Sequence, residues 1–415
     1  MLLFWLEVKR LLKTRSTQII LALALVLSAV MAYLPISFAQ YSYLDEIGQK
    51  VTLEGRAAIA AKKADMAPYS GSVTPEKMMS ALAVYQEEEA RYGSIYSDEF
   101  PLNVYNERIR PAYTLIKRLQ EVNADGKTGM APEIADLTAQ DAANFYPQCQ
   151  IHLADLMRQE QKEHLQAQEK AIEMYEKVEQ PFVFYYGLNR ESMDYLVLYL
   201  FLLLLLGTMV AAPVFAAEYQ SKADQILRCT RYGRLRLAMV KIGAAACILT
   251  ALFAVCLTIF TLITNSAFGW ESRQTTIQVL FSAVTLPALN MGQLQTITIA
   301  AGAITFLATM SCTLFFSSRC QSNVGALALS LGGCLLPLLL YFIVGGHNWA
   351  DWLRCLLPAA GAGINNSFHY AFIDFTFLHL GSWSVWEPWV MMAAAVVEIP
   401  VFLAMSVYTY CRHRL

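Results

Sequence analysis

Long stretches without a single charged residue dominate this sequence and limit how it can fold. No Asp, Glu, Lys or Arg occurs between Arg15 and Asp45, or in the 45 residues between Arg273 and Arg319. Only 15% of the 415 residues are charged, whereas an ordinary soluble protein carries about a quarter. A helix of about 20 apolar residues spans a bilayer because it satisfies its own backbone hydrogen bonds. The blocks therefore predict an integral membrane protein.

The apolar blocks predict an all-α fold with six transmembrane helices. The expected crossings are 17–39, 193–217, 237–264, 294–316, 324–345 and 389–411. A 45-residue uncharged block is too long for one crossing, so 265–293 is interpreted as an outer loop with an interfacial or re-entrant helix that Pro287 breaks. The same block keeps an eight-crossing arrangement open. A cleavable signal peptide is the alternative for the first run, which is long for that role.

Lys and Arg beside the crossings favour one orientation. Six crossings put these basic residues on one side: Lys9, Arg10, Lys13, Arg15, Lys222, Arg228, Arg231, Arg234, Arg236, Arg319, Arg412 and Arg414. Such residues concentrate on the cytoplasmic side of membrane proteins. Both termini are therefore expected in the cytoplasm, and residues 1–16 are expected to form an amphipathic start there. The multi-pass protein is expected in the cell membrane, which we take to be a bacterial plasma membrane.

Two polar segments are expected outside. Residues 40–192 hold 24 Asp and Glu against 16 Lys and Arg, a net charge of about −8. Apolar positions there recur at helical spacing, which predicts a small helical domain without strands. Its acidic balance either recruits cations or a cationic peptide, or is a solvated surface. Residues 346–388, rich in Gly and Pro, are expected to form a re-entrant cap. Trp383, Trp386 and Trp389 at its end are expected to form an aromatic belt at the outer interface.

Few residues suggest chemistry. The one near match to a phosphate-binding loop, Gly126-Lys127-Thr128, has Glu121 where the first glycine is required. The nine Cys show no metal-site spacing, and a disulfide between Cys149 and Cys355 stays open. His369, Asp374 and His379 do not share a helical face. We therefore expect no catalytic residue, metal or cofactor in this chain, and its net charge of −2 suggests no nucleic-acid partner.

Residues 218–236 form a short basic loop between the second and third crossings. A carboxylate ends the second crossing, two apolar residues follow, and arginines lead to the third. The candidate residues are Glu218, Ile226, Leu227, Arg228, Arg231 and Arg234. Such a loop can transmit a partner's motion into the membrane, or be a plain basic loop that sets the orientation.

Glu398 lies in the sixth predicted crossing, two residues before Pro400. Because a carboxylate in lipid is costly, we expect it to face the bundle, either in a pathway or interface or in a structural hydrogen bond near the proline.

The loop resembles the cytoplasmic segment of the ABC-2 type transporter permease family. Members commonly have Phe-Ala-x-Glu at the end of the second span, an Ile/Leu-Leu pair, an arginine at the turn and a lysine entering the third span. The matching residues are Phe215-Ala216-Ala217-Glu218, Ile226-Leu227, Arg234 and Lys241. Many relatives have a proline near Cys229-Thr230-Arg231. As a motif the likeness covers about 30 residues, and as a layout nearly the whole chain.

The resemblance implies the permease subunit of an ABC exporter. It implies a separate ATP-binding subunit that carries ATP and Mg, contact with it through 218–236, and a second permease copy, either identical or related, in the lipid bilayer. The alternative is a membrane sensor whose outer domain binds a ligand such as an antimicrobial peptide. A membrane-embedded enzyme lacks a suitable set of residues. Fold-level likeness does not fix the transported substrate.

Overall fold

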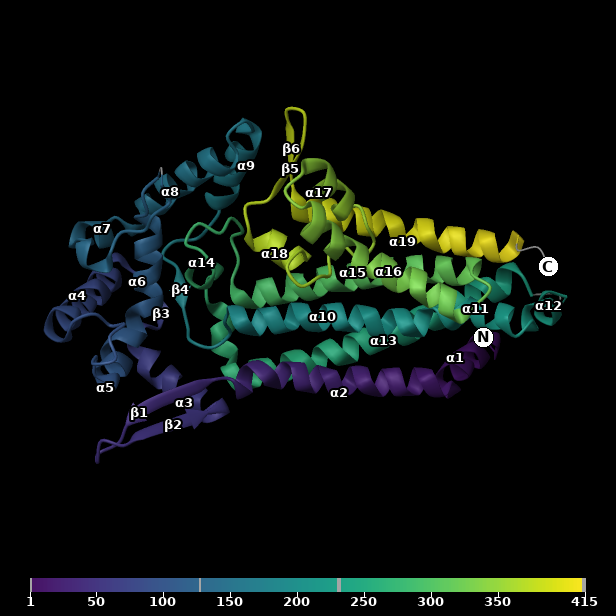
Figure 1. Cartoon of the computed structure of the whole chain (residues 1–415), viewed down its shortest axis with the longest axis horizontal. Coiled ribbons are helices and arrows are strands. Elements are labelled where there is room, and N and C mark those ends of the chain that lie inside the picture. The colour runs from purple at the N-terminus through teal and green to yellow at the C-terminus, as the bar shows by residue number, and fades with distance from the viewer. Residues whose placement is uncertain (1, 127, 230–232, 413–415) are drawn as a thin grey trace.

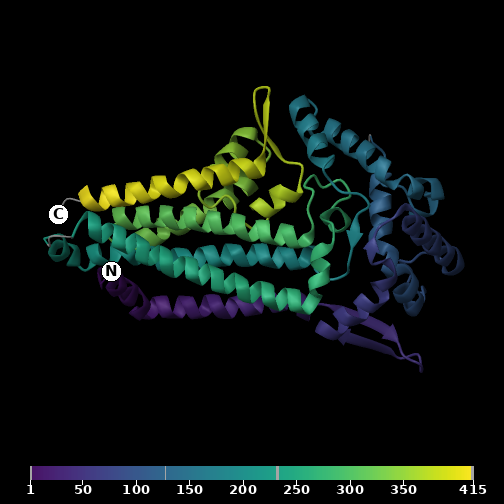
Figure 2. The same cartoon turned by 180° about the vertical axis from the view of Figure 1, so that it is seen from behind.

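The computed structural model describes residues 2–126, 128–229 and 233–412. The molecule is elongated and mostly helical, with a helical bundle at one end and a smaller domain at the other (Figure 1). The first and last described residues both lie at the bundle end away from that domain (Figure 2). We call this end the termini end and the opposite one the domain end.

Six helices of the described chain are long and apolar enough to cross a membrane. They are α2 (Arg15–Ser37), α10 (Arg190–Ala211) continued by α11 (Pro213–Gln220), α13 (Leu235–Phe268), α15 (Met291–Arg319), α16 (Asn323–Val344) and α19 (Glu387–Arg412). These helices support the multi-pass membrane protein predicted from the apolar blocks. The third crossing continues past its predicted end at residue 264 to Phe268, and near this end the Asn265 amide donates to Gln295 Oε1 of α15 at 3.0 Å.

The second and fourth crossings form the centre of the bundle. Of their most apolar stretches, 72% and 61% of the residues are buried, against 17% for α16 and α19. Small residues bring α10 and α15 together in both directions. Gly207 of α10 lies against the Phe306 ring, and Gly302 of α15 lies against the Leu200 side chain. A Cβ at Gly207 would be 2.6 Å from the ring, so the close approach requires glycine there.

The polar insertion between α2 and α10 folds into the separate domain. Its described residues, 40–126 and 128–189, contain seven helices, two single-turn 3-10 helices, a short π-helix and four short strands. They are β1 (Gln40–Leu44), β2 (Lys50–Glu54), α3 (Gly55–Met66), η1 (Ala67–Tyr69), β3 (Gly71–Ser72), α4 (Pro75–Tyr92), α5 (Leu102–Val104), η2 (Tyr105–Ile109), α6 (Arg110–Val122), η3 (Ile134–Asp136), α7 (Ala139–Ala143), α8 (Phe145–Glu160), α9 (Leu165–Tyr175) and β4 (Val183–Phe184). Gly126 and Thr128 follow α6, whereas Lys127 lies outside the described residues.

The prediction that this domain has no strands is wrong. β1 and β2 pair antiparallel, and β3 pairs with β4. Tyr41 and Tyr43 face Leu53 and Val51, so the side chains do alternate along both strands. Each strand has only five residues, which is too short for the alternation to stand out beside long helical patterns. Asp45 closes the hairpin by accepting two backbone N–H bonds.

The domain is fastened to the loop between α13 and α15. This loop contains η4 (Trp270–Gln274) and α14 (Ile277–Leu280). Arg118 of α6 donates to the carbonyl of Phe281 at 2.5 Å, and Glu121 accepts from the hydroxyl of Ser282. Tyr175 of α9 donates to the carbonyl of Ala283 at 2.8 Å. The α-helical part of the predicted interfacial stretch is thus α14 with four residues, which packs against α6 of the domain.

A second attachment joins the domain to the segment before α19. That segment contains α17 (Asn348–Cys355), α18 (Phe368–Ile373), β5 (Phe377–Leu380) and β6 (Trp383–Trp386). The imidazole of His164, between α8 and α9, stacks on His379 of β5 with ring centres 3.5 Å apart. Lys170 of α9 donates to the carbonyl of Ser384 at 2.6 Å. The β5–β6 hairpin is a small exception within the mostly helical fold that was predicted, and it stands beside the bundle at the domain end (Figure 1).

A buried ion pair holds the same segment to the start of α19. Arg354 of α17 donates to Glu387 Oε1 at 2.5 Å and to the carbonyl of Asn366 at 3.2 Å. Both charged side chains are almost fully buried. Cys355 next to them is buried and free, as is Cys149 in the domain. The disulfide considered between these two cysteines is therefore not formed.

Candidate functional site

The predicted coupling residues lie at the termini end but do not form one cluster. Glu218 is buried near the end of α11, whereas Ile226 and Leu227 lie in α12 (Ala223–Arg228), which projects at the tip of this end (Figure 1). Arg234 is exposed just before α13. Arg231 and the side chain of Arg228 lie outside the described part of the chain.

A reversal of the chain places α12 beside α11. Ser221 donates its hydroxyl to the carbonyl of Ala217 at 2.9 Å and so ends α11. Lys222 then adopts a left-handed backbone conformation with φ of 58°, which turns the chain before α12 begins. The projecting element is therefore short and directly joined to a membrane helix.

Four charged residues from three helices meet beneath α12. Arg10 of α1 (Leu2–Lys13) contacts Glu7 at 2.7 Å and Glu218 at 3.6 Å. Lys241 of α13 contacts Glu218 and lies 3.4 Å from Glu7. Two positive and two negative charges thus balance within the cluster. We call Glu7, Arg10, Glu218 and Lys241 the base cluster.

Three of the four charged side chains of the base cluster are buried, so breaking a pair there is costly. The Lys241 side chain has no exposed surface, and both carboxylates are nearly buried. A charge in such a place is stable only when it is paired, since it has lost its water. The pairs therefore fix α1, α11 and α13 relative to one another.

Glu7 was missed in the sequence. In the structure Glu7, Val8 and Leu11 of α1 are buried, whereas Trp5 is exposed. The signal was present: Glu7 lies at helical spacing from Phe4 and Leu11, on the apolar face of α1. A carboxylate on that face requires a buried partner, and Lys241 supplies it.

A break in the helical hydrogen bonds above the base cluster separates α10 from α11. Pro213 has no N–H, and a proline disrupts the hydrogen bonds of the turn around it. Ser317 of α15 compensates, since its hydroxyl accepts the backbone N–H bonds of Phe215 at 2.9 Å and Ala216 at 3.2 Å. The start of α11, which leads to Glu218, is thus held by a neighbouring membrane helix.

Glu398 is far along the chain from the base cluster and forms no ion pair with a described residue. It lies in α19, which packs along α15. Its Oε2 atom is buried and has no hydrogen-bond partner in the described structure. The roles predicted for it, in a pathway or an interface, stay predictions.

The histidines considered as metal ligands lie apart from each other. His369 is buried in α18, where its Nδ1 contacts the hydroxyl of Thr298 at 3.1 Å. Burial lowers the pKa of His369 to about 3, so its imidazole is neutral. His379 stacks on His164 instead. Within the described residues no group of His, Cys, Asp and Glu could hold a metal ion.

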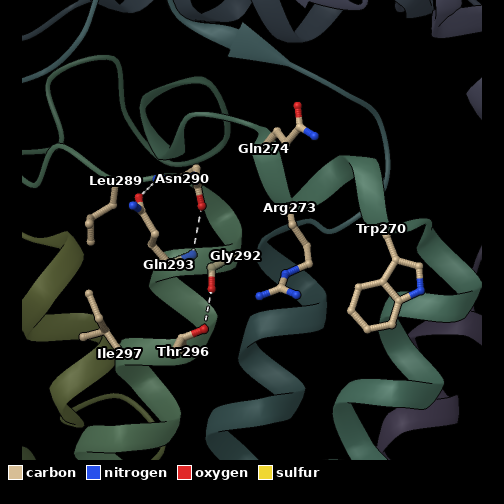
Figure 3. Close-up of a pocket in the computed structure, with 9 residues that line it drawn as sticks. All are labelled: Trp270, Arg273, Gln274, Leu289, Asn290, Gly292, Gln293, Thr296 and Ile297. Atoms are coloured by element: carbon tan, nitrogen blue, oxygen red, sulfur yellow. Dashed lines mark hydrogen bonds between the residues drawn. The ribbon is translucent and has the colours of Figure 1, made fainter.

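Two hollows at the domain end were not predicted. One of about 510 Å³ has mixed walls, to which Arg273, Asn290 and Gln293 contribute polar groups, and we call it the polar hollow. The Arg273 guanidinium lies between Trp270 on one side and Thr296 of α15 on the other (Figure 3). The other, also of about 510 Å³, is apolar and lies between α15, α18 and α19. Leu289 and Ile297 line both hollows. No family model, curated protein or solved structure matches this chain.

Proposed function

We propose that this chain is the membrane-spanning subunit of an ABC exporter that a separate ATP-binding subunit drives. ATP and Mg belong to that partner, and a second copy of this chain or a related one completes the complex. In this proposal the termini end faces the cytoplasm and the chain carries no catalytic residue. ATP-driven closure of the partner would move a hydrophobic or amphipathic substrate outward.

The exposed side chain of Ile226 is the observation that carries this proposal. It is 76% exposed on a short helix at the tip of the termini end, beyond the buried parts of α11 and α13. An exposed apolar side chain on a short projecting helix is suited to a pocket on another protein. The base cluster below α12 joins α11 to α1 and α13. A force on α12 would thus act on three helices together.

Replacing Ile226 by glutamate is expected to abolish capture of the ATP-binding subunit. A carboxylate cannot enter an apolar pocket without losing its water, which costs far more than the contact supplies. The measurement is affinity purification of the tagged full-length chain from membranes of its own cells. Mass spectrometry then identifies any co-purified chain with a Gly-x-x-x-x-Gly-Lys-Ser/Thr sequence, and its ATPase activity is assayed.

Ile47→Glu is the matched control, since Ile47 is 84% exposed in the β1–β2 turn at the opposite end. It should retain the ATP-binding chain. If the wild-type protein captures no such chain, the proposed function fails. If Ile226→Glu captures it as well as Ile47→Glu does, the assignment of α12 as the contact fails.

A cavity in the separate domain favours a second candidate, a sensor that binds a cationic peptide. The cavity measures about 850 Å³, and Glu89, Glu133 and Asp136 are among its lining residues. None of these carboxylates forms an ion pair with a described residue. Burial, and then the charge of Glu133, raises the pKa of Glu89. A cationic ligand would relieve this repulsion.

For the sensor, the double change Glu89→Gln and Glu133→Gln should weaken binding of a synthetic Lys/Leu amphipathic peptide about tenfold. Wild-type binding should also weaken as the pH falls through the raised pKa of Glu89, because the protonated carboxyl loses its charge. Isothermal titration of the full-length chain in detergent measures both. Glu163→Gln with Glu169→Gln is the control, since these exposed carboxylates lie outside the cavity. Equal losses in both double variants would contradict the sensor.

A further inference from the structure

The two hollows at the domain end adjoin each other and together form one site with a polar part and an apolar part. They adjoin at Leu289 and Ile297, which line both. Along α15 the polar hollow is lined by Gln293 and Thr296, and the apolar one by Ala300 and Ile304 further along. With a rise of 1.5 Å per residue, this order extends over about 16 Å. Polarity therefore falls in one direction, from the helix end into the bundle.

Arg273 has hydrogen-bonding capacity that the described protein does not use. Its neighbour Glu271 pairs with Lys63 at 3.1 Å, and Arg273 itself forms no ion pair with a described residue. Its Nε is buried and has no hydrogen-bond partner there. A guanidinium offers a planar set of donors that matches two oxygens of a phosphate group.

The guanidinium of Arg273 is held in place by its surroundings. It lies 5.5 Å from the centre of the Trp270 ring, within cation–π range. On its other side the first turn of α15 has Gly292, where a Cβ would be 2.8 Å from the Arg273 Nε. Any larger residue at 292 would displace the side chain. The hollow thus presents one oriented positive charge (Figure 3).

Two exposed tryptophans mark the level of the site in the membrane. Trp270 flanks the polar hollow and is 51% exposed, and Trp389 flanks the apolar one and is 66% exposed. Exposed Trp side chains concentrate at the boundary between head groups and hydrocarbon. The positive charge then lies at head-group level, and the apolar cavity opens toward the acyl chains.

We propose that these two hollows bind one glycerophospholipid from the leaflet at the domain end. Arg273 holds the phosphate, and one acyl chain occupies the cavity between α15, α18 and α19. A lone phosphate would leave the apolar cavity empty, and a neutral hydrocarbon would leave Arg273 unpaired. This inference does not depend on an ATP-binding partner, because it concerns only the chain and its bilayer.

Native mass spectrometry of the full-length chain in detergent tests the proposal with dioleoylphosphatidylglycerol as the probe. Arg273→Gln should weaken binding about tenfold, the loss typical of a charge-assisted hydrogen bond. Ala300→Phe, which fills the apolar cavity from an exposed position on α15, should weaken it at least as much. The controls are Arg158→Gln on the domain surface and Ala254→Phe on the exposed face of α13, which should bind like the wild type.

Two further probes distinguish the sources of affinity. Dioleoylglycerol has the same chains without phosphate, and should bind weakly and equally to the wild type and Arg273→Gln. Inorganic phosphate alone should not compete with the lipid at equal concentration. Wild-type affinity for the lipid in both site variants would overturn the proposal, as would equally tight binding of dioleoylglycerol or full competition by phosphate. Arg273→Lys keeps the charge without the planar donors. If Arg273→Gln does not fold, Arg273→Lys takes its place in the test and should bind the lipid with intermediate affinity.

Discussion

The protein with Lys241 replaced by methionine is expected to lose about 3–5 kcal/mol of stability, the cost of breaking a buried ion pair from one side. Lys241 is the ammonium that contacts both Glu7 and Glu218, and it has no exposed surface. Without it, two buried carboxylates share the single guanidinium of Arg10. The measurement is denaturant unfolding of the purified chain in detergent.

Lys63→Met is a matched control, because Lys63 also pairs with a glutamate, Glu271, but on the surface. Exposed pairs contribute about 0–1 kcal/mol, so this change should be almost neutral. Combining Lys241→Met with Glu218→Gln removes one charge of each sign. The double variant should therefore be less destabilised than the sum of its single variants. Strict additivity would show that the base cluster does not couple α11 to α13.

Replacing Glu387 by leucine is expected to loosen the segment between α16 and α19. Arg354 would remain buried without the carboxylate that it contacts at 2.5 Å, at a cost of about 3–5 kcal/mol. Cys355 reports on this directly. Its thiol is buried beside Glu387, and burial, followed by the Glu387 charge, raises its pKa. Both opening of the segment and loss of that negative charge should speed its alkylation.

The measurement is the rate of N-ethylmaleimide labelling at Cys355, followed by peptide mass spectrometry. We expect an increase of about tenfold or more, since each 1.4 kcal/mol of local opening gives a factor of ten. Cys149 is the internal control: it is buried in the separate domain, where burial raises its pKa to about 12. An unchanged rate at Cys355, or equal acceleration at Cys149, would contradict a local role for the Arg354–Glu387 pair.

The long apolar helices could be predicted from the sequence, whereas the short strands and the contacts between distant residues could not. The six apolar blocks are each long enough to specify a helix on their own. The β1–β2 hairpin was missed because five-residue strands carry little periodic signal. Its alternation of Tyr41 and Tyr43 became clear only beside the paired strand.

The candidate sites show the same division. Glu218 and Ile226 could be proposed from the sequence because they lie close together along the chain. The pairing of Glu7 with Lys241 joins residues that are 234 positions apart, and no local pattern specifies that contact. Arg273 and Ile297 come to line one hollow only when the η4 turn packs on α15. The position of Glu7 on the apolar face of α1 was a local signal that this carboxylate has a partner distant in sequence.

The attachments of the separate domain constrain how the bundle can open. The domain continues from α2 at one edge of the bundle and contacts the β5–β6 hairpin, which leads into α19, at the other edge (Figure 1). Its contacts with 281–283 lie between these edges. The domain thus acts as a crossbar that fixes the spacing of α2 and α19 where it spans them. Separation of α2 and α19 is therefore easiest at the termini end. If the bundle opens, the two helices would rotate apart there about a hinge located next to the domain.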